Sequence, residues 1–296
     1  MERLAYAFLG LYIPLAIGIV YRKFSKNCYS TSRDLSRLVL YFFLPLLLFD
    51  SISRKRFEAL VEDFFYMVSA ATVIALISII AALVVFRGER EMVLPSTYLN
   101  ALYLPIPIAY TLWGPESLYL AGFYALVNTC LGNISAPLLL VRGGIKRGIK
   151  RLFRFPPFYA VLLGMLVSAS KIQLPRALGG LIADLGRLAP YLALIVLGLQ
   201  ASDFRNIVDR DTRRIVIIRF VISPLSAFML FPLWIPVYSL AFKVALIESF
   251  MPPAVSNVIL ANELMEKPER IANVVFKATL LSTLIIPLLI VVVGSI

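Results

Sequence analysis

Four stretches of this sequence carry no charged side chain, and this feature constrains the fold more than any other. They are residues 4–21, 64–86, 92–115 and 117–141. A bilayer core about 30 Å thick needs ~20 apolar residues of helix to cross it. The chain has 296 residues, 60% hydrophobic and 16% charged, whereas soluble domains average about 45–50% apolar and about 25% charged residues. The sequence therefore predicts an integral membrane protein.

Further apolar stretches bounded by charge bring the predicted spans to ten, in an all-α fold. We expect the first span to stay as a helix, because no small-residue cleavage pattern precedes Arg22 and Lys23. The second span tolerates Arg37 and Asp50 at its ends. The additional predicted spans are residues 35–53, 156–172, 178–202, 213–234, 237–262 and 270–294.

The distribution of Lys and Arg predicts the orientation in the membrane. One set of alternate loops, which includes the basic linker 142–155, holds three times as many Lys and Arg as the other set. Cytoplasmic loops carry the excess of positive charge. This pattern places the first set in the cytoplasm and both termini outside the cell, in a multi-pass plasma-membrane protein.

The composition excludes several classes of function. The chain has no histidine, so Ser-His-Asp triads, the HExxH zinc helix and His-ligated metals are absent. Cys28 and Cys130 are too few and too far apart for a zinc cluster. The formal charge of +12 accompanies no basic stripe with interleaved aromatics, so we expect no nucleic acid partner. We expect no cofactor, no metal site and no enzymatic activity.

The linker 142–155 divides the chain into two halves, 1–141 and 156–296, with five predicted spans each. Because five is odd, similar halves would have opposite orientations in the membrane. Pro107 follows Gly18 at the same sequence distance as Pro253 follows Gly164. Pro45 and Pro190 correspond within one residue. We therefore predict two inverted five-helix repeats.

Prolines fall inside the fourth and ninth predicted spans. Proline removes a backbone donor and clashes with the preceding turn, so LPIP (Leu104 to Pro107) and MPPA (Met251 to Ala254) are expected to interrupt their helices. Freed backbone groups must be buried in protein or line a wet cavity. Two crossing breaks would make a substrate site; simple kinks for packing are the alternative.

Polar residues near these breaks are the candidates for function, because ionisable groups within a membrane are costly. Glu248 is expected either to couple transport to a proton or cation, or to pair with Lys243. Asn128 is expected to join helices, and Arg219 to reach the cytoplasmic surface as an anchor. The substrate-binding candidates are Asn100, Pro105, Pro107, Pro252, Pro253 and Asn257, and the candidates for coupling or charge compensation are Glu248, Lys277 and Asp50.

Several motifs resemble those of the auxin efflux carrier family, which is related to the bile acid:sodium symporters. Phe155 stands where that family usually has Asn, and Ala101 and Pro105 stand where it often has Gly. The motifs that carry the resemblance are RLVLYFFLPLLLF (37–49), NALYLPIPIAYTLWG (100–114), FPPFYAVLLGMLV (155–167), MPPAVSNVILANEL (251–264) and TLLSTLIIPL (279–288).

The resemblance implies a scaffold of helices 1, 2, 6 and 7 and a moving transport domain of helices 3–5 and 8–10. It implies a prokaryotic or archaeal member, and a secondary transporter that carries a small organic anion, most simply a carboxylate, by an elevator or rocking movement. A sodium-coupled symporter of the bile acid type and a non-transporting sensor are the alternatives, and sodium or proton coupling stays open. An acid near the start of helix 3, which auxin carriers have, would correspond to Glu62 or Asp63. The expected partners are the anion, membrane lipids and a second copy of the chain.

Overall fold

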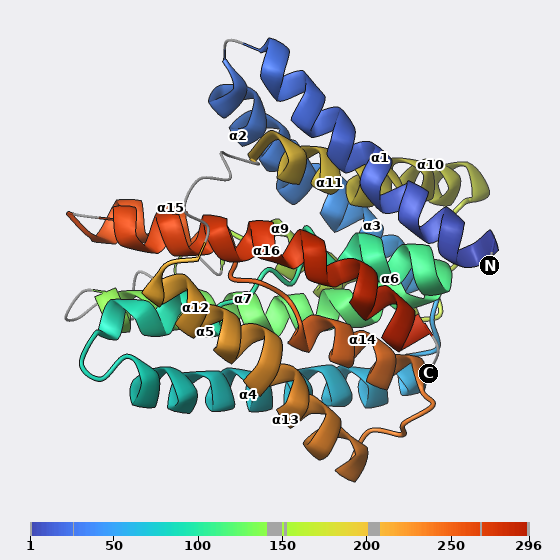
Figure 1. The fold of residues 1–296 in the computed structure, drawn as a ribbon. Helices are drawn as coiled ribbons and strands as arrows, with labels where there is room; N and C mark the ends of the chain where they lie inside the picture. Colours follow the sequence, from blue (N-terminus) through green and yellow to red (C-terminus); the bar gives the residue numbers. More distant parts are fainter. Residues whose placement is uncertain are drawn as a thin grey trace. The chain divides into compact units, whose positions relative to one another are not determined.

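A computed structural model describes residues 2–25, 27–140, 150, 153–200, 208–266 and 268–294 (Figure 1). Over these residues the chain is helical and forms no strand, only an isolated bridge between Leu99 and Pro253. Most of the predicted linker 142–155, together with Lys26, Arg205 and Lys267, lies outside the described residues. The α-helices are α1 (Glu2–Phe24), α2 (Cys28–Leu38), α3 (Leu44–Ser53), α4 (Phe57–Val85), α5 (Val93–Thr97), α6 (Pro105–Trp113), α7 (Leu118–Leu140), α9 (Pro156–Ala169), α10 (Arg176–Gly186), α11 (Leu188–Gln200), α12 (Arg210–Ile217), α13 (Ser223–Leu230), α14 (Leu240–Ser249), α15 (Ser256–Leu264) and α16 (Glu269–Gly294).

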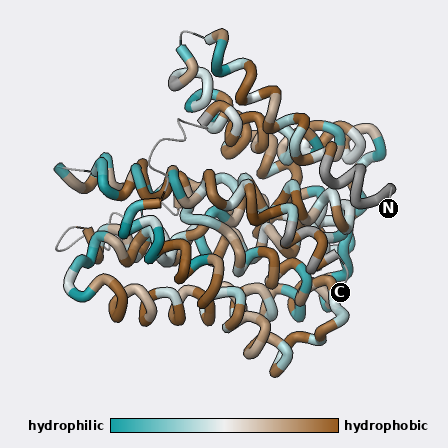
Figure 2. The backbone as a smooth tube through the Cα atoms, in the orientation of Figure 1, coloured by the Kyte–Doolittle hydropathy of each residue, from teal (hydrophilic) through white to brown (hydrophobic). Residues whose placement is uncertain are grey.

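Six helical segments within the described residues are long and apolar enough to cross a membrane. The longest single helix, α4, carries acidic residues in its first two turns and is mostly hydrophobic beyond them (Figure 2). The prediction of an all-helical membrane protein is confirmed. The six segments are Ser30–Ser53, Phe57–Val85, Pro105–Leu140, Arg176–Leu199, Arg210–Leu233 and Glu269–Pro287.

Two short π-helical turns sit directly before prolines. The turn η1 (Val39–Phe43) precedes Pro45 in α3, and the turn η4 (Ile218–Ile222) precedes Pro224 in α13. A proline cannot donate to the carbonyl one turn earlier, and a wider turn absorbs the missing bond. At η4 the Ser223 hydroxyl donates to the Ile218 carbonyl at 2.9 Å.

The chain divides into two compact units, and each unit takes segments from both halves of the sequence. Helices α4 and α7 contribute residues to both. Unit 1 contains Met1–Phe65, Leu102–Phe123 and Phe155–Ala201, and unit 2 contains Tyr66–Ala101, Tyr124–Arg154 and Ser202–Ile296.

In unit 1 two helix pairs pack at equivalent glycines. A Cβ atom on Gly18 of α1 would collide with the backbone carbonyl of Ile195 in α11. A Cβ atom on Gly164 of α9 would meet the carbonyl of Phe49 in α3 at 3.3 Å. The sequence separation that relates Gly18 to Gly164 also relates Phe49 to Ile195. The two halves of the chain therefore exchange equivalent close contacts.

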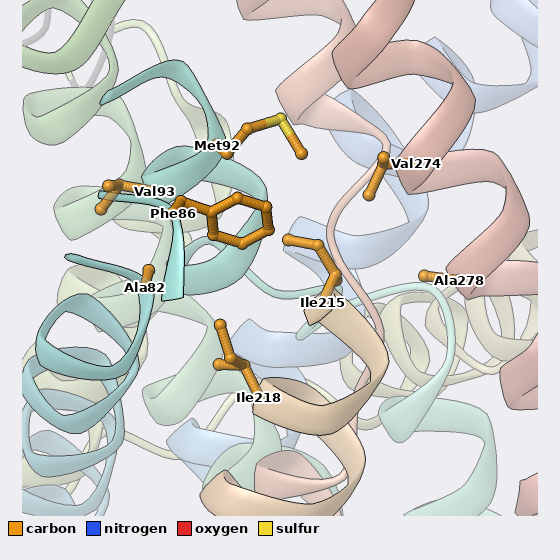
Figure 3. Packing of buried hydrophobic residues seen from close by; sticks show 8 residues of the cluster. All are labelled: Ala82, Phe86, Met92, Val93, Ile215, Ile218, Val274 and Ala278. Atoms are coloured by element: carbon orange, nitrogen blue, oxygen red, sulfur yellow. The ribbon is translucent and has the colours of Figure 1, made fainter. Parts of the chain in front are cut away.

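Unit 2 has a core cluster around Phe86, at the end of α4 (Figure 3). The cluster joins the end of α4 to α5, α12, η4 and α16, so segments from both halves of the sequence share one apolar core. The buried members are Ala82, Phe86, Met92, Val93, Ile215, Ile218, Val274 and Ala278.

Beside this core, acidic and basic side chains of unit 2 form an ion-pair network. Arg270 at the start of α16 binds Glu89, Glu91 and Asp211, with distances of 2.9 Å to Glu91 and 2.8 Å to Asp211. Arg214 of α12 pairs with the same Glu89 at 3.5 Å. These pairs connect the segment before α5 to the starts of α12 and α16.

The glycine contacts of unit 1 give a matched test. Gly18→Ala is expected to lower the stability of the folded protein by about 1–3 kcal/mol, because the added methyl overlaps a backbone carbonyl that cannot move alone. Gly164→Ala is also expected to lower it, because its added methyl would lie 2.9 Å from the Ile52 Cβ atom. The control is Gly180→Ala on α10, where a Cβ meets no atom within 4 Å. Thermal unfolding in detergent measures all three, and wild-type stability of both Gly18→Ala and Gly164→Ala would contradict the close contacts.

Candidate functional site

Two predicted spans are interrupted in the structure. The first break separates α5, which ends at Thr97, from α6, which begins at Pro105; the second separates α14, which ends at Ser249, from α15, which begins at Ser256. Pro105 and Pro107 therefore open the helix after the break, rather than breaking it themselves. Proline suits the first helical position because its missing N–H would have no helical partner there.

The extended residues of the two breaks pair with each other inside unit 2. The amide of Asn100 donates to the carbonyl of Pro252 at 2.8 Å, and the amide of Ala254 donates to the carbonyl of Tyr98 at 2.9 Å. Between them, Leu99 and Pro253 face each other as an antiparallel bridge. We call residues 98–100 and 252–254 the crossing.

The amide side chain of Asn128 in α7 completes the hydrogen bonding of Leu99. Its Oδ1 accepts from the Leu99 amide at 3.3 Å, and its Nδ2 donates to the Leu99 carbonyl at 2.8 Å. Because Leu99 is 2% exposed, water cannot take this place. The Asn128 side chain thus makes the two hydrogen bonds that a neighbouring strand would make to Leu99 at the edge of the crossing.

Asn257 of α15 binds the crossing from its other end. Its Nδ2 donates at 2.8 Å to the carbonyl of Tyr98 and at 2.8 Å to the carbonyl of Ala254. The side chain is fully buried, and its Oδ1 has no hydrogen-bond partner among the described residues. Asn257 therefore holds the crossing and keeps one acceptor open.

The prediction that Arg219 reaches the cytoplasmic surface as an anchor is wrong. Arg219 is fully buried in the turn η4 and lies beside the second break. Its Nε donates to the Met251 carbonyl at 3.0 Å and its Nη2 to the Ser249 carbonyl at 3.2 Å. Its Nη1 donates to the hydroxyls of Ser78 and Ser223, at 3.1 and 3.0 Å. The guanidinium remains inside unit 2 because the end of α14 supplies acceptors there.

Glu248, in the last turn of α14, is also fully buried. Neither carboxylate oxygen has a hydrogen-bond partner within the described chain. Arg219 and Tyr124 lie within electrostatic range of it, and the Tyr124 hydroxyl is likewise buried without a partner among described groups. The polar centre of unit 2 thus combines one guanidinium, one carboxylate and one phenol.

Lys277 and Asp50, the other candidates for coupling or charge compensation, each form an ion pair of their own. Lys277 of α16 pairs with Asp209 at 2.5 Å, and Asp209 also caps α12 by accepting from the Thr212 amide at 2.7 Å. Burial raises the pKa of Asp209, but the hydrogen bonds from Lys277 and Thr212 outweigh it and the net pKa is lowered. Asp50 of α3 accepts from Arg54 at 2.6 Å in unit 1. Asn100, Pro252, Pro253 and Asn257 meet at the crossing, whereas Pro105 and Pro107 belong to unit 1.

Asp63 belongs to a separate cluster in unit 1. It accepts from the Tyr119 hydroxyl at 2.7 Å. Lys55 lies over the Tyr119 ring, 5.1 Å from its centroid, and forms an ion pair with Glu116. Burial lowers the pKa of the Lys55 ammonium, while Asp63 opposes that shift.

Sequence reasoning did not find the role of Arg219, Ser78 or Tyr124. The available signal for Arg219 was its position in RFVIS, since a cation that deep in an apolar span must find partners there. Ser78 and Tyr124 gave no signal, because single hydroxyls are common in membrane helices.

Six helical segments long enough to cross a membrane, together with two interrupted spans that pair at their breaks, are the features of a multi-pass membrane protein. Residues 27–142 and 144–290 match the family model described as membrane transport protein. The chain therefore belongs to this transporter family, that of the auxin efflux carriers.

Two archaeal proteins show similarity over most of their lengths. An uncharacterized transporter of Methanothermobacter thermautotrophicus is 27% identical over 291 residues, which is 95% of each chain. An uncharacterized transporter of Methanocaldococcus jannaschii is 26% identical over 283 residues, covering 87% of this chain and 88% of that one.

The edge contact of Asn128 yields a direct prediction. Asn128→Ala leaves the buried N–H and C=O of Leu99 without these hydrogen bonds, which is expected to lower the free energy of unfolding by about 1–3 kcal/mol for each group. Asn128→Asp keeps the acceptor but sets a buried carboxylate against the Leu99 carbonyl, so its loss of stability is expected to be at least as large. Urea or thermal unfolding measures the series.

Asn133→Ala is the matched control, because Asn133 on the same helix donates to the Thr129 carbonyl of its own preceding turn, at 2.9 Å, and bonds no residue of the crossing in the described parts of the chain. If Asn128→Ala and Asn133→Ala lose the same stability, Asn128 has no special part in the crossing.

Proposed function

We propose that this protein is a secondary transporter that moves a small organic anion, most simply a carboxylate, across the cell membrane by alternating access. The observation that carries the proposal is the crossing, where two interrupted helices pair their free backbone inside a buried polar centre. Helices interrupted near mid-membrane are the sites at which secondary transporters bind substrate and ions.

The helix ends at the crossing suit an anion. Helix α15 begins directly after the second break, within the same unit as the crossing, and a helix N-terminus carries partial positive charge. Asn257 offers amide groups at the same place. An organic anion can thus be held without a full salt bridge, which favours release on the other side.

The glycine contacts support an inverted repeat of ten helices. The contact from Gly18 to the Ile195 carbonyl and the contact from Gly164 to the Phe49 carbonyl have exchanged positions in the two halves, as a two-fold axis between the repeats requires. Inverted repeats provide two related conformations, one open to each side. We propose that unit 1 acts as the scaffold and that unit 2 carries the substrate in an elevator or rocking movement.

The positive-inside pattern supports a plasma-membrane location with both termini outside. A homodimer of two such chains is part of this proposal.

Counterflow into proteoliposomes tests the function. Vesicles preloaded with unlabelled malate, malonate or indole-3-acetate receive the same compound labelled outside, with no ion gradient. We expect exchange of one class of carboxylate, because exchange needs only a working site. Folded protein that exchanges none of the panel would contradict a carboxylate carrier, while binding without flux would indicate a sensor.

Pro253→Ala tests whether the second break is required for transport. The substitution adds a buried N–H and lets α14 continue towards α15, so counterflow is expected to fall at least about tenfold, a loss of ~1.4 kcal/mol of activation free energy. Pro236→Ala, on the exposed connection before α14, is the control. Wild-type exchange by a folded Pro253→Ala protein would show that transport does not need the proline break.

A further inference from the structure

Arg219 is the largest fully buried side chain of the described protein. It donates four hydrogen bonds, two to the hydroxyls of Ser78 and Ser223 and two to the carbonyls of Ser249 and Met251. None of these four acceptors carries a formal charge. The guanidinium is therefore solvated by neutral oxygen atoms, as a bound cation would be.

The two carbonyls lie where α14 ends and the crossing begins. The last carbonyls of a helix have no partner within it and carry partial negative charge. Left alone, the carbonyls of Ser249 and Met251 would attract a free cation to this buried place.

The nearby carboxyl group of Glu248 adds a negative charge when it is ionised. Glu248 is buried one residue before Ser249, and its two oxygens have no hydrogen-bond partner in the described parts of the chain. Arg219 lies within electrostatic range of it. A buried ion is tolerated only when an opposite charge compensates it, and Arg219 provides that charge without leaving the carbonyls.

We propose that Arg219 is a tethered cation that occupies the place of a coupling ion at the crossing, so that this transporter exchanges its substrate without sodium. The claim that exchange needs no sodium rests on the proposed function; we call it the transport part. The claim that Arg219 fills a cation site is the site part, and binding and stability measurements alone can test it. The site part names Arg219 as a positioning residue: it holds the end of α14 and does not bind the transported anion.

The site part is tested by chemical rescue of folding stability, which requires no transport. Arg219→Ala leaves a cavity with two free carbonyls and an uncompensated Glu248, so its melting temperature is expected to fall. Guanidinium at about ten times its Kd is expected to raise that temperature by about 2–4 °C, and sodium chloride to raise it more than choline chloride does. The wild-type protein is expected to show neither effect.

Two further variants serve as controls. Arg213→Ala removes an exposed arginine from α12, and no rescue by guanidinium is expected. Arg219→Met combined with Glu248→Gln removes both charges, and it is expected to be more stable than Arg219→Met alone because no buried charge is left uncompensated.

If Arg219→Ala does not fold, Arg219→Lys keeps the charge with fewer donors and is expected to fold. Stability of Arg219→Lys that rises with sodium as much as with guanidinium would contradict a filled site.

The transport part uses counterflow in sodium chloride and in choline chloride. Equal exchange by the wild-type protein in both salts is expected. Exchange that requires sodium would overturn the proposal. Absence of rescue in folded Arg219→Ala would overturn it independently of any transport result, whereas absence of exchange with intact rescue would overturn the proposed function alone.

Discussion

The hydrogen bonds between residues 98–100 and 252–254 are the interaction on which the rest of unit 2 depends. Each broken helix leaves donors and acceptors that neither lipid nor an apolar core can satisfy. Pairing the two breaks satisfies one edge of each. Asn128 satisfies the free edge of Leu99, Asn257 binds the carbonyls of Tyr98 and Ala254, and Arg219 binds the end of α14. The prolines reduce the problem because they bring no N–H into the second break.

This arrangement links local chemistry to the transport proposal. A crossing whose bonds come from α5, α7, α14 and α15 within one unit is expected to remain rigid while that unit changes position. The close glycine contacts of unit 1, which involve backbone carbonyls, give the proposed scaffold a comparable rigidity. The oxygen atoms of Glu248 and Asn257 that have no hydrogen-bond partner among the described residues mark where the rigid crossing can still respond to a ligand or proton.

Hydropathy predicted an all-helical membrane protein but not the contacts between its helices. The apolar stretches indicated where helices lie, because a run of about 20 apolar residues crosses the bilayer core as a helix. The two interruptions were predicted from the prolines, yet the first begins before LPIP, since Pro105 is better accommodated as the first residue of α6. Asn128 was expected to join helices, and the structure adds that it does so through the backbone of Leu99. Arg219 was misplaced because its partners Ser78, Ser249 and Met251 come from distant segments, and a single sequence contains no register between them.

A disulfide between the two segments of the crossing tests its geometry most directly. Tyr98 and Ala254 are opposite one another beside the bridge and belong to one buried apolar cluster, so their β-carbons are expected about 4.5–5.5 Å apart, near the upper limit that a disulfide can join. With Cys28 and Cys130 replaced by serine, Tyr98→Cys combined with Ala254→Cys is expected to give a disulfide-linked peptide pair by mass spectrometry after mild oxidation. Tyr98→Cys with Ile259→Cys, on the exposed side of α15, is expected to give none. Folded protein in which the first pair does not link, or in which both pairs link equally, would contradict the crossing.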